Sequence, residues 1–146
     1  MNFMKEALKE AKKAYDIKEV PVGAVIVKDG KIIARGYNKK EKNTLAIEHA
    51  ELIAIKKASK KLGNWRLIGC EMYVTLEPCP MCAGAIMQSR ISKLHIASKD
   101  TVSGASGTVI DITNNKDLNY KLDVEFGELE EESKKLLKTF FKELRK

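Results

Sequence analysis

Residues 71–97 read EMYVTLEPCPMCAGAIMQSRISKLHIA, and this stretch decides the fold. Two β-rich runs, Glu71–Leu76 and Lys93–Ala97, lie on either side of a short helical segment, Pro80–Ser89. Pro80 suits the first position of a helix, because the N–H that proline lacks is not needed there. Two strands joined through a helix form a β-α-β unit, so we expect parallel pairing in an α/β protein.

The segments before this unit add a helix, a hairpin and a second helix. Residues 3–15 place apolar side chains at intervals of three and four, which is typical of an amphipathic helix. Residues 22–28 and 31–36 are β-rich and enclose Asp29-Gly30, a dipeptide that favours a two-residue hairpin turn. A further helical pattern covers residues 48–61.

The segments after the unit complete a mixed five-stranded sheet. Residues 98–119 are rich in Ser, Gly, Thr, Asn and Asp, and they predict a long irregular loop. Ordered loops of that length in a small domain are often functional. A strand at residues 122–126 and a helix from Glu128 to the end follow, so we expect one domain over residues 1–146.

Composition narrows the class of protein. The chain has 27 Lys and Arg against 20 Asp and Glu, and the net charge of +7 favours a polyanionic partner such as nucleic acid. No apolar run approaches the ~18 residues of a membrane span, and the N-terminus lacks the apolar stretch of a secretory signal. We therefore expect a cytoplasmic location, no membrane partner, and reduced thiols at the three cysteines.

His49, Cys79 and Cys82 have the chemistry and spacing of a zinc-binding set. Zinc binds imidazole nitrogen and thiolate sulfur at ~2.0–2.3 Å, and three protein ligands with one open position are typical of a catalytic site. Cys79 and Cys82 lie three residues apart at a helix start, where the N-terminus stabilises thiolates. We expect one Zn²⁺ per chain.

Glu51, two positions after His49, is the candidate catalytic residue. Positions two apart on a regular helix point about 200° away from each other, so we expect the site at the end of that helix. Zinc makes hydroxide available near neutral pH, and a carboxyl group within reach can move the proton. The pattern His-x-Glu followed by Pro-Cys-x-x-Cys is the signature of zinc nucleobase deaminases, and it predicts hydrolytic deamination of a heterocycle.

A closed, structural zinc site would need a fourth ligand, for which Cys70 and His95 are the remaining thiol and imidazole. Cys70 precedes a strand of six residues, which places it ~20 Å from Cys79 at ~3.3 Å per residue. We therefore expect Cys70 to be a core thiol. We expect His95 to pack or to face the surface, and Trp65 to be a packing residue.

Several longer segments match one family: VPVGAVIV (20–27), Gly36-Tyr37-Asn38, His49-Ala50-Glu51, Trp65-Arg66-Leu67, YVTLEPCPMCAGAI (73–86), Ser89-Arg90-Ile91 and FFKELR (140–145). In these segments the chain resembles the bacterial tRNA-specific adenosine deaminases, which belong to the cytidine and deoxycytidylate deaminase superfamily. The resemblance covers nearly the whole chain and is most specific over residues 20–91.

The resemblance implies a cytidine-deaminase-like, three-layer α/β/α fold and a homodimer. It implies conversion of the wobble adenosine of an arginine tRNA anticodon to inosine, with zinc on the His and Cys residues above and Glu51 as the proton carrier. It also implies that Asn38 hydrogen-bonds the flipped base. The remaining implied substrate contacts are the pocket-lining residues Val22, Gly23 and Ala24, and the backbone of Ala50.

The chain departs from the family outside these chemical residues. Ala46-Ile47-Glu48, Asp100-Thr101-Val102 and Asn119-Tyr120-Lys121 replace the usual Pro-Thr-Ala, Asp-Pro-Lys and Asn-His-Arg. Three hypotheses follow: an enzyme that edits an anticodon loop, a deaminase of a free base or nucleoside such as guanine or cytosine, and a non-catalytic zinc module that binds nucleic acid. Basic charge favours the first hypothesis over the second, and Glu51 favours an enzyme over the third.

Overall fold

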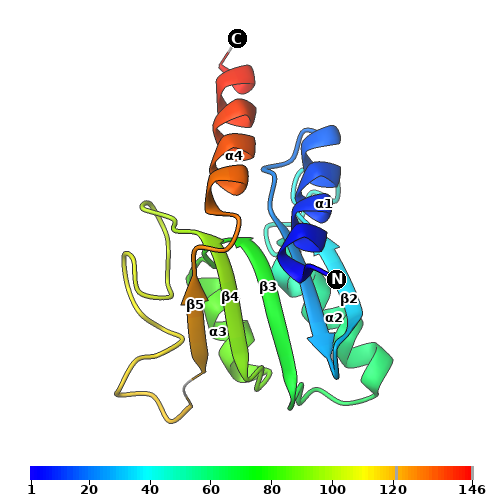
Figure 1. The fold of residues 1–146 in the computed structure, drawn as a ribbon, viewed down its shortest axis with the longest axis vertical. Helices are drawn as coiled ribbons and strands as arrows, with labels where there is room; N and C mark the ends of the chain where they lie inside the picture. Colours follow the sequence, from blue (N-terminus) through cyan, green and yellow to red (C-terminus); the bar gives the residue numbers. More distant parts are fainter. Residues whose placement is uncertain (121, 146) are drawn as a thin grey trace.

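A five-stranded sheet with strand order β2-β1-β3-β4-β5 forms the centre of the protein. The computed structural model describes residues 1–120 and 122–145, and Figure 1 shows their arrangement. In chain order the elements are α1 (Phe3–Asp16), β1 (Gly23–Lys28), β2 (Lys31–Tyr37), α2 (Ala50–Leu62), β3 (Cys70–Leu76), α3 (Pro80–Gln88), β4 (Lys93–Ser98), β5 (Asp123–Phe126) and α4 (Glu130–Leu144).

The sheet is mixed, as the sequence predicts. Strand β1 pairs antiparallel with both β2 and β3, whereas β3–β4 and β4–β5 are parallel pairs. The parallel pairing of β3 with β4 confirms the β-α-β unit. Asp29 and Gly30 have φ values of 52° and 75°, and positive φ at both central residues is the requirement of a type I′ hairpin turn.

Helices cover both faces of the sheet. Ala24 and Ile26 of β1 pack in a cluster with α2 and α3, whereas Val25 and Val27 pack with α1 on the other face. A strand buried on both faces has no polar alternation, which explains the continuous apolar run of β1. In Figure 1, α1 lies in front of the sheet, α2 and α3 lie behind it, and α4 extends beyond the upper end of the strands. The three-layer α/β/α fold is therefore confirmed.

Helix α2 lies unusually close to the hairpin. Ala50, Ala54 and Ala58 are fully buried on its sheet-facing side, and small side chains permit a close approach of helix and sheet. At Gly36 of β2 a Cβ atom would lie 2.9 Å from the Ala54 nitrogen and closer still to the Ala50 carbonyl oxygen. This contact fixes the first turn of α2, which places its N-terminus at one end of the sheet.

The chain between β4 and β5 is irregular, as predicted, with one isolated bridge between Ser106 and Asp111. Helix α4 begins at Glu130, two residues later than expected. Gly127 and Leu129 have φ values of 110° and 57°, so the backbone turns through left-handed conformations before the helix starts. Among the described residues, no helix is long and apolar enough to cross a membrane.

The close packing of Gly36 against α2 leads to a prediction about stability. Gly36→Ala should lower the free energy of unfolding by about 1–3 kcal/mol, the cost of overpacking a tight interior. Gly84→Ala is the matched control, because no atom lies within 4 Å of its added Cβ and alanine favours a helix by about 0.5–1 kcal/mol. Urea unfolding followed by circular dichroism measures both, and equal stabilities would contradict the prediction.

Candidate active site and metal centre

Three metal-ligating atoms meet where two helices begin. His49 is the N-cap residue of α2, Cys79 is the N-cap residue of α3, and Cys82 follows in the first turn of α3. The His49 Nδ1 atom lies 3.8 Å from Cys79 Sγ and 3.5 Å from Cys82 Sγ, and the three atoms lie within 4.8 Å of one another. Ligands of one tetrahedral zinc ion are separated by about 3.5–3.8 Å, so this donor set fits zinc.

The local sequence keeps these side chains free for a metal. An N-cap residue is usually Ser, Thr, Asp or Asn, whose side chain bonds the first turn of the helix. His49 and Cys79 have the extended backbone of a cap, but neither side chain makes a capping hydrogen bond. Pro80 occupies the start of α3, where its missing N–H removes a donor that would need a partner. Both caps therefore direct their side chains toward a shared point.

The two thiols shift each other's pKa in opposite directions. A hydrogen bond from the Cys82 thiol, assisted by His49, lowers the pKa of Cys79 to about 4. The same hydrogen bond and burial raise the pKa of Cys82. The hydrogen bond to Cys79 also raises the pKa of His49. Metal binding requires both thiolates and a neutral imidazole, so it would release protons from this group.

Glu51 lies beside the thiols in the first turn of α2. Its side chain is buried, and this burial raises the pKa of Glu51 to about 7. A carboxyl group near that value can both accept and donate a proton at neutral pH. The site therefore lies at the N-terminal end of α2, as predicted, because His49 is the cap residue of this helix and Glu51 lies in its first turn.

A cavity of about 380 Å³ opens onto this group. His49, Glu51 and Cys79 line one part of it, and Lys18 and Lys40 lie at its border. Helix α4 closes another side with Phe140, Phe141 and Leu144. Cavities of this size, mostly apolar with a few polar groups, are typical of small-molecule and base-binding sites.

Asn38 lines the cavity and also connects two segments around it. Its side-chain amide donates to the Val20 carbonyl at 3.0 Å, and its Oδ1 accepts from the Ala50 backbone N–H at 2.8 Å. These bonds tie the first turn of α2 to the segment before β1. One N–H and one lone pair of the amide remain for a substrate.

The other predicted substrate contacts differ in their positions. Val22 lines the cavity. Gly23 packs against the backbone of α1 and donates its N–H to Thr75 Oγ1, while Ala24 is fully buried in the core. The N–H of Ala50 is occupied by Asn38. Substrate contacts at Gly23, Ala24 and Ala50 stay predictions.

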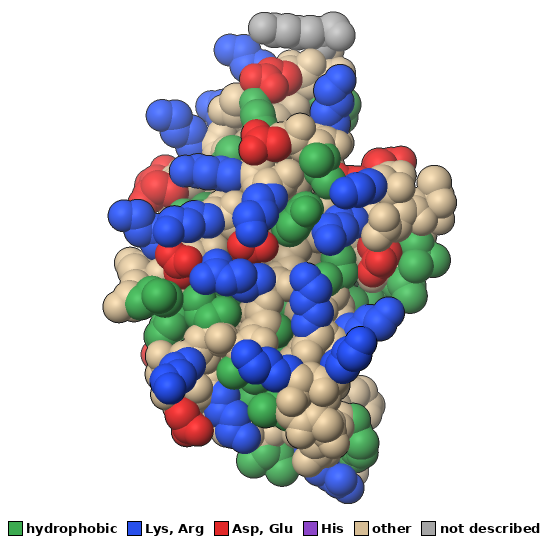
Figure 2. All heavy atoms as spheres, turned by 90° about the vertical axis from the view of Figure 1, so that its right-hand side faces the viewer, with side chains coloured by type: hydrophobic (Ala, Val, Ile, Leu, Met, Phe, Trp, Pro, Cys, Tyr) green, Lys and Arg blue, Asp and Glu red, His purple; other side chains and the backbone are tan. Residues whose placement is uncertain are grey.

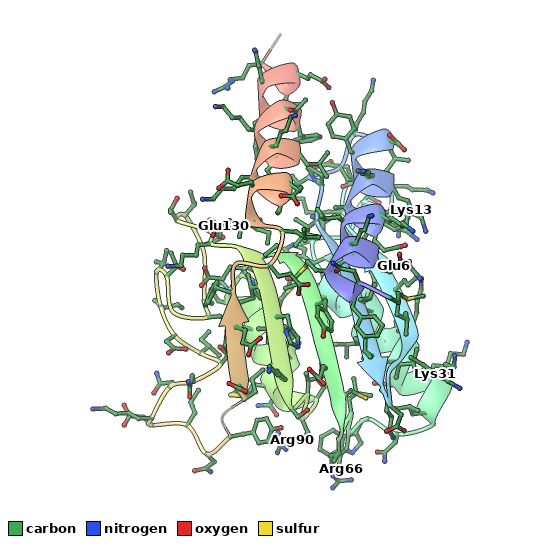
Figure 3. The ribbon with its side chains drawn as sticks, in the orientation of Figure 1. Glu6, Lys13, Lys31, Arg66, Arg90 and Glu130 are labelled. Atoms are coloured by element: carbon green, nitrogen blue, oxygen red, sulfur yellow. The ribbon has the colours of Figure 1, made fainter. Side chains whose placement is uncertain are left out.

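The residues excluded as ligands lie away from the metal group. Cys70 is a fully buried thiol at the start of β3, as expected. His95 is also buried, stacks on Tyr73 with ring centroids 3.9 Å apart, and bonds Glu71 at 2.7 Å. Trp65 contradicts its packing prediction, because it is 53% exposed with the Arg66 guanidinium over its ring. Figure 3 shows Arg66 at the end of the molecule away from α4.

Sequence reasoning missed two buried carboxylates that organise loops around the cavity. Glu19 accepts hydrogen bonds from the backbone N–H groups of Glu41 and Lys42, and it is 2% exposed. Glu77 does the same for the loop after β4. Their signal in the sequence was weak, because an isolated Glu beside an apolar run is usually on the surface.

Comparison with known proteins is consistent with this geometry. Residues 1–98 match the model of the cytidine and deoxycytidylate deaminase zinc-binding region. A tRNA-specific adenosine deaminase of Bacillus subtilis is 50% identical over 144 residues, which cover 99% of this chain and 89% of that protein. The Aquifex aeolicus protein of the same name is 46% identical, over 98% and 94%.

Solved structures of related deaminases align with this chain. One from a study of A-to-I editing by tRNA:A34 deaminases at the wobble position of transfer RNA aligns with a TM-score of 0.89 and 41% identity, over 92% of this chain and 98% of that one. A guanine deaminase from Bacillus subtilis aligns with a TM-score of 0.64 and 34% identity, over 82% and 88%. The chain belongs to the zinc-dependent cytidine and deoxycytidylate deaminase family and, within it, to the tRNA-specific adenosine deaminases.

The metal group makes a prediction about zinc content. Cys82→Ser should lose most bound zinc, because two ligands no longer hold the ion well and serine is a poor zinc ligand. Cys70→Ala, which removes the buried thiol outside the group, should keep one zinc per chain. Elemental analysis of purified protein measures both, and full zinc in Cys82→Ser would contradict the assignment.

Proposed function

We propose that the protein deaminates the wobble adenosine to inosine in the anticodon loop of a tRNA, an arginine tRNA by the family resemblance. The observation that carries this proposal is one cavity that borders the His-Cys-Cys group, through His49 and Cys79, and the buried carboxyl group of Glu51. The comparisons supply the substrate, since similar proteins over nearly the full chain are named as tRNA-specific adenosine deaminases. The balanced reaction is adenosine plus water to inosine plus ammonia.

His49, Cys79 and Cys82 are the proposed zinc ligands, one ion per chain. When bound, zinc supplies Lewis-acid activation of water near neutral pH. The three side chains leave one side of the group facing the cavity, where His49 and Cys79 are both part of the wall. An open position of this kind distinguishes a catalytic from a structural zinc site.

Glu51 is the proposed proton carrier. Its carboxyl group takes a proton from the attacking water, transfers it to a ring nitrogen of the adenine, and assists the departure of ammonia. Burial, which raises the pKa of Glu51 to about 7, matches a group that must first accept and then donate. Proton transfer by a positioned side chain typically contributes about 10²–10⁴-fold in rate.

Asn38 and Val22 are the proposed contacts to the flipped base. The base must leave the anticodon stack to reach the cavity, and unpaired loop bases do so at low cost. Asn38 is held from both ends of its amide, so its remaining donor points in a fixed direction. Gly23 and Ala24 remain proposed pocket-lining residues, and the Ala50 backbone remains a proposed substrate contact.

Positive charge supports a nucleic-acid substrate. The net charge is +7, and Figure 2 shows Lys and Arg side chains spread over one entire face with acidic groups between them. Spread charge of this kind attracts a polyanion over long range. The lining of the cavity itself includes the cationic side chains of Lys18 and Lys40 and the aromatic rings of Phe140 and Phe141, which together suit a nucleic-acid base and its backbone.

Two residues at which the chain departs from the family, Val102 and Tyr120, are not among the residues that line the cavity. Val102 is 85% exposed and offers no charge to RNA. Tyr120 donates its hydroxyl to the Ile91 carbonyl and has the Arg90 guanidinium over its ring, so it is a packed residue and not a free stacking platform. Lys121, expected to keep a positive charge here, lies outside the described residues. We propose that the remaining cations around the cavity take over the phosphate contacts.

A homodimer and a cytoplasmic location complete the proposal. Large apolar side chains remain exposed near the cavity segments, as expected of a surface that a second copy covers: Leu45, Ile47, Met81, Val109 and Ile110. The proposed tRNA substrate and the reduced thiols of the metal group are both typical of the cytoplasm.

Guanine deamination is the second candidate, favoured by the 34% identity to a guanine deaminase structure. Incubation with an arginine tRNA transcript that has adenosine at the wobble position should give inosine by sequencing. Free adenosine, cytosine and guanine in parallel should give no ammonia. Turnover of guanine without editing of tRNA would replace the first proposal with the second.

Glu51→Gln tests the proton carrier. The amide has nearly the shape of the acid but cannot accept a proton, so kcat should fall at least about 10²-fold. Zinc content should stay at one ion per chain. Glu128→Gln is the matched control outside the cavity and should keep full activity. Wild-type kcat in Glu51→Gln would exclude the proposed role.

A further inference from the structure

Glu77 is a buried carboxylate that the chemistry described above does not use. It lies between the end of β3 and Cys79, is 2% exposed, and its side chain lines the catalytic cavity. Both of its oxygens accept hydrogen bonds from the loop after β4. The donors are the backbone N–H groups of Asp100 (3.1 Å), Ser106 (2.9 Å) and Thr108 (3.1 Å), and the hydroxyl group of Thr108.

The same loop is packed tightly on Glu77. A Cβ atom at Gly104 would lie 2.6 Å from Glu77 Oε1, so this position has no room for a side chain. The Ala105 N–H donates to the carbonyl of Pro78 at 2.9 Å, which adds a second connection to the residue before Cys79. Residues 100–108 are therefore bonded directly to the segment that presents a metal-ligating thiol.

This loop forms part of the cavity wall through Asp100 and Ser103. Asp100 in turn accepts bonds from the N–H groups of Val102 and Ser103 and from the Ser103 hydroxyl, so the turn is internally fixed. Loops of this composition would sample many conformations without such bonds. Four hydrogen bonds to one buried charge-bearing group are a strong local constraint, because charged acceptors bind donors more tightly than neutral ones.

We propose that Glu77 is a positioning residue that holds residues 100–108 at the mouth of the catalytic cavity, and that this fixed loop is needed to bind the RNA around the flipped base. The inference rests on the proposed function. Glu77 touches no reacting atom in this assignment. Its loss should therefore affect the affinity for RNA much more than the rate of the chemical step.

Glu77→Gln is the direct test. The amide group places N–H donors against the N–H donors of the loop, which removes about half of the bonds and leaves buried donors unpaired. With a wobble-adenosine arginine tRNA transcript, KM should rise about tenfold or more while kcat changes less than about threefold. Zinc content should stay at one ion per chain, and limited proteolysis should cleave residues 100–108 faster than in the wild type.

The division between KM and kcat separates positioning from general instability. A partly unfolded preparation contains less active enzyme, which lowers the apparent kcat but leaves KM unchanged. Thr108→Val removes one donor without altering Glu77, and it should raise KM by a smaller factor. Asn115→Ala is the control in the same β4–β5 connection but outside residues 100–108. Among the described residues its side chain bonds only the Asp117 N–H, so this variant should leave KM and kcat unchanged.

Each outcome has one meaning. An unchanged KM in zinc-loaded Glu77→Gln overturns the inference, and so does a loss confined to kcat. If Glu77→Gln does not fold, an unchanged KM in Thr108→Val overturns it and a raised KM supports it. Absence of tRNA editing by the wild-type protein would instead be a failure of the proposed function. Faster cleavage of residues 100–108 in Glu77→Gln would still show that Glu77 holds this loop.

Discussion

The meeting of two helix N-termini at one end of the sheet is the constraint on which the rest of the site depends. Helices α2 and α3 begin at His49 and Cys79, and both cap side chains are free of capping bonds. The approach of α2 is set by small residues, with Gly36 of β2 against its first turn. The start of α3 is set by the end of β3 through Pro78 and Pro80. The positions of the metal-ligating residues therefore depend on how the two helices pack against the sheet.

Burial and hydrogen bonding then give each group at that meeting point a different protonation behaviour. The hydrogen bond between the two thiols lowers the pKa of Cys79 and raises that of Cys82, whereas burial is the main cause that raises the pKa of Glu51 to about 7. Three titratable groups a few ångströms apart thus differ because their environments differ. Pairs of groups whose environments separate their pKa values are typical of acid–base catalysis.

Two buried carboxylates hold the loops around the cavity through hydrogen bonds. Glu19 holds the loop at residues 41–42 and Glu77 holds residues 100–108, and both side chains are 2% exposed. In each case a charged acceptor inside the protein replaces the regular hydrogen bonds that an irregular segment lacks. The walls of the cavity are therefore ordered although they contain little secondary structure.

The sequence predicted most of the elements because their signals are local. The Asp29-Gly30 turn, the β-α-β unit and the two halves of the site, His49 with Glu51 and Cys79 with Cys82, follow from residue types at short spacings. It also excluded Cys70 from the site by chain length alone. The start of α4 was placed too early, since left-handed backbone at Leu129 has no signature in a leucine. Trp65 was predicted to be a packing residue, but it is 53% exposed with the Arg66 guanidinium over its ring, a contact that its residue type does not indicate.

What the sequence by itself determined, then, is the order of the elements, the chemistry of the ligands and the position of Glu51 at a helix start. Only the tertiary structure decided which groups share the cavity: that Phe140 and Phe141 of α4 border it, that Asn38 is already bonded on both sides, and that Glu77 tethers a distant loop. The physical reason is distance along the chain. Contacts between residues that are distant in the sequence depend on how the layers pack, and packing is a property of the whole fold.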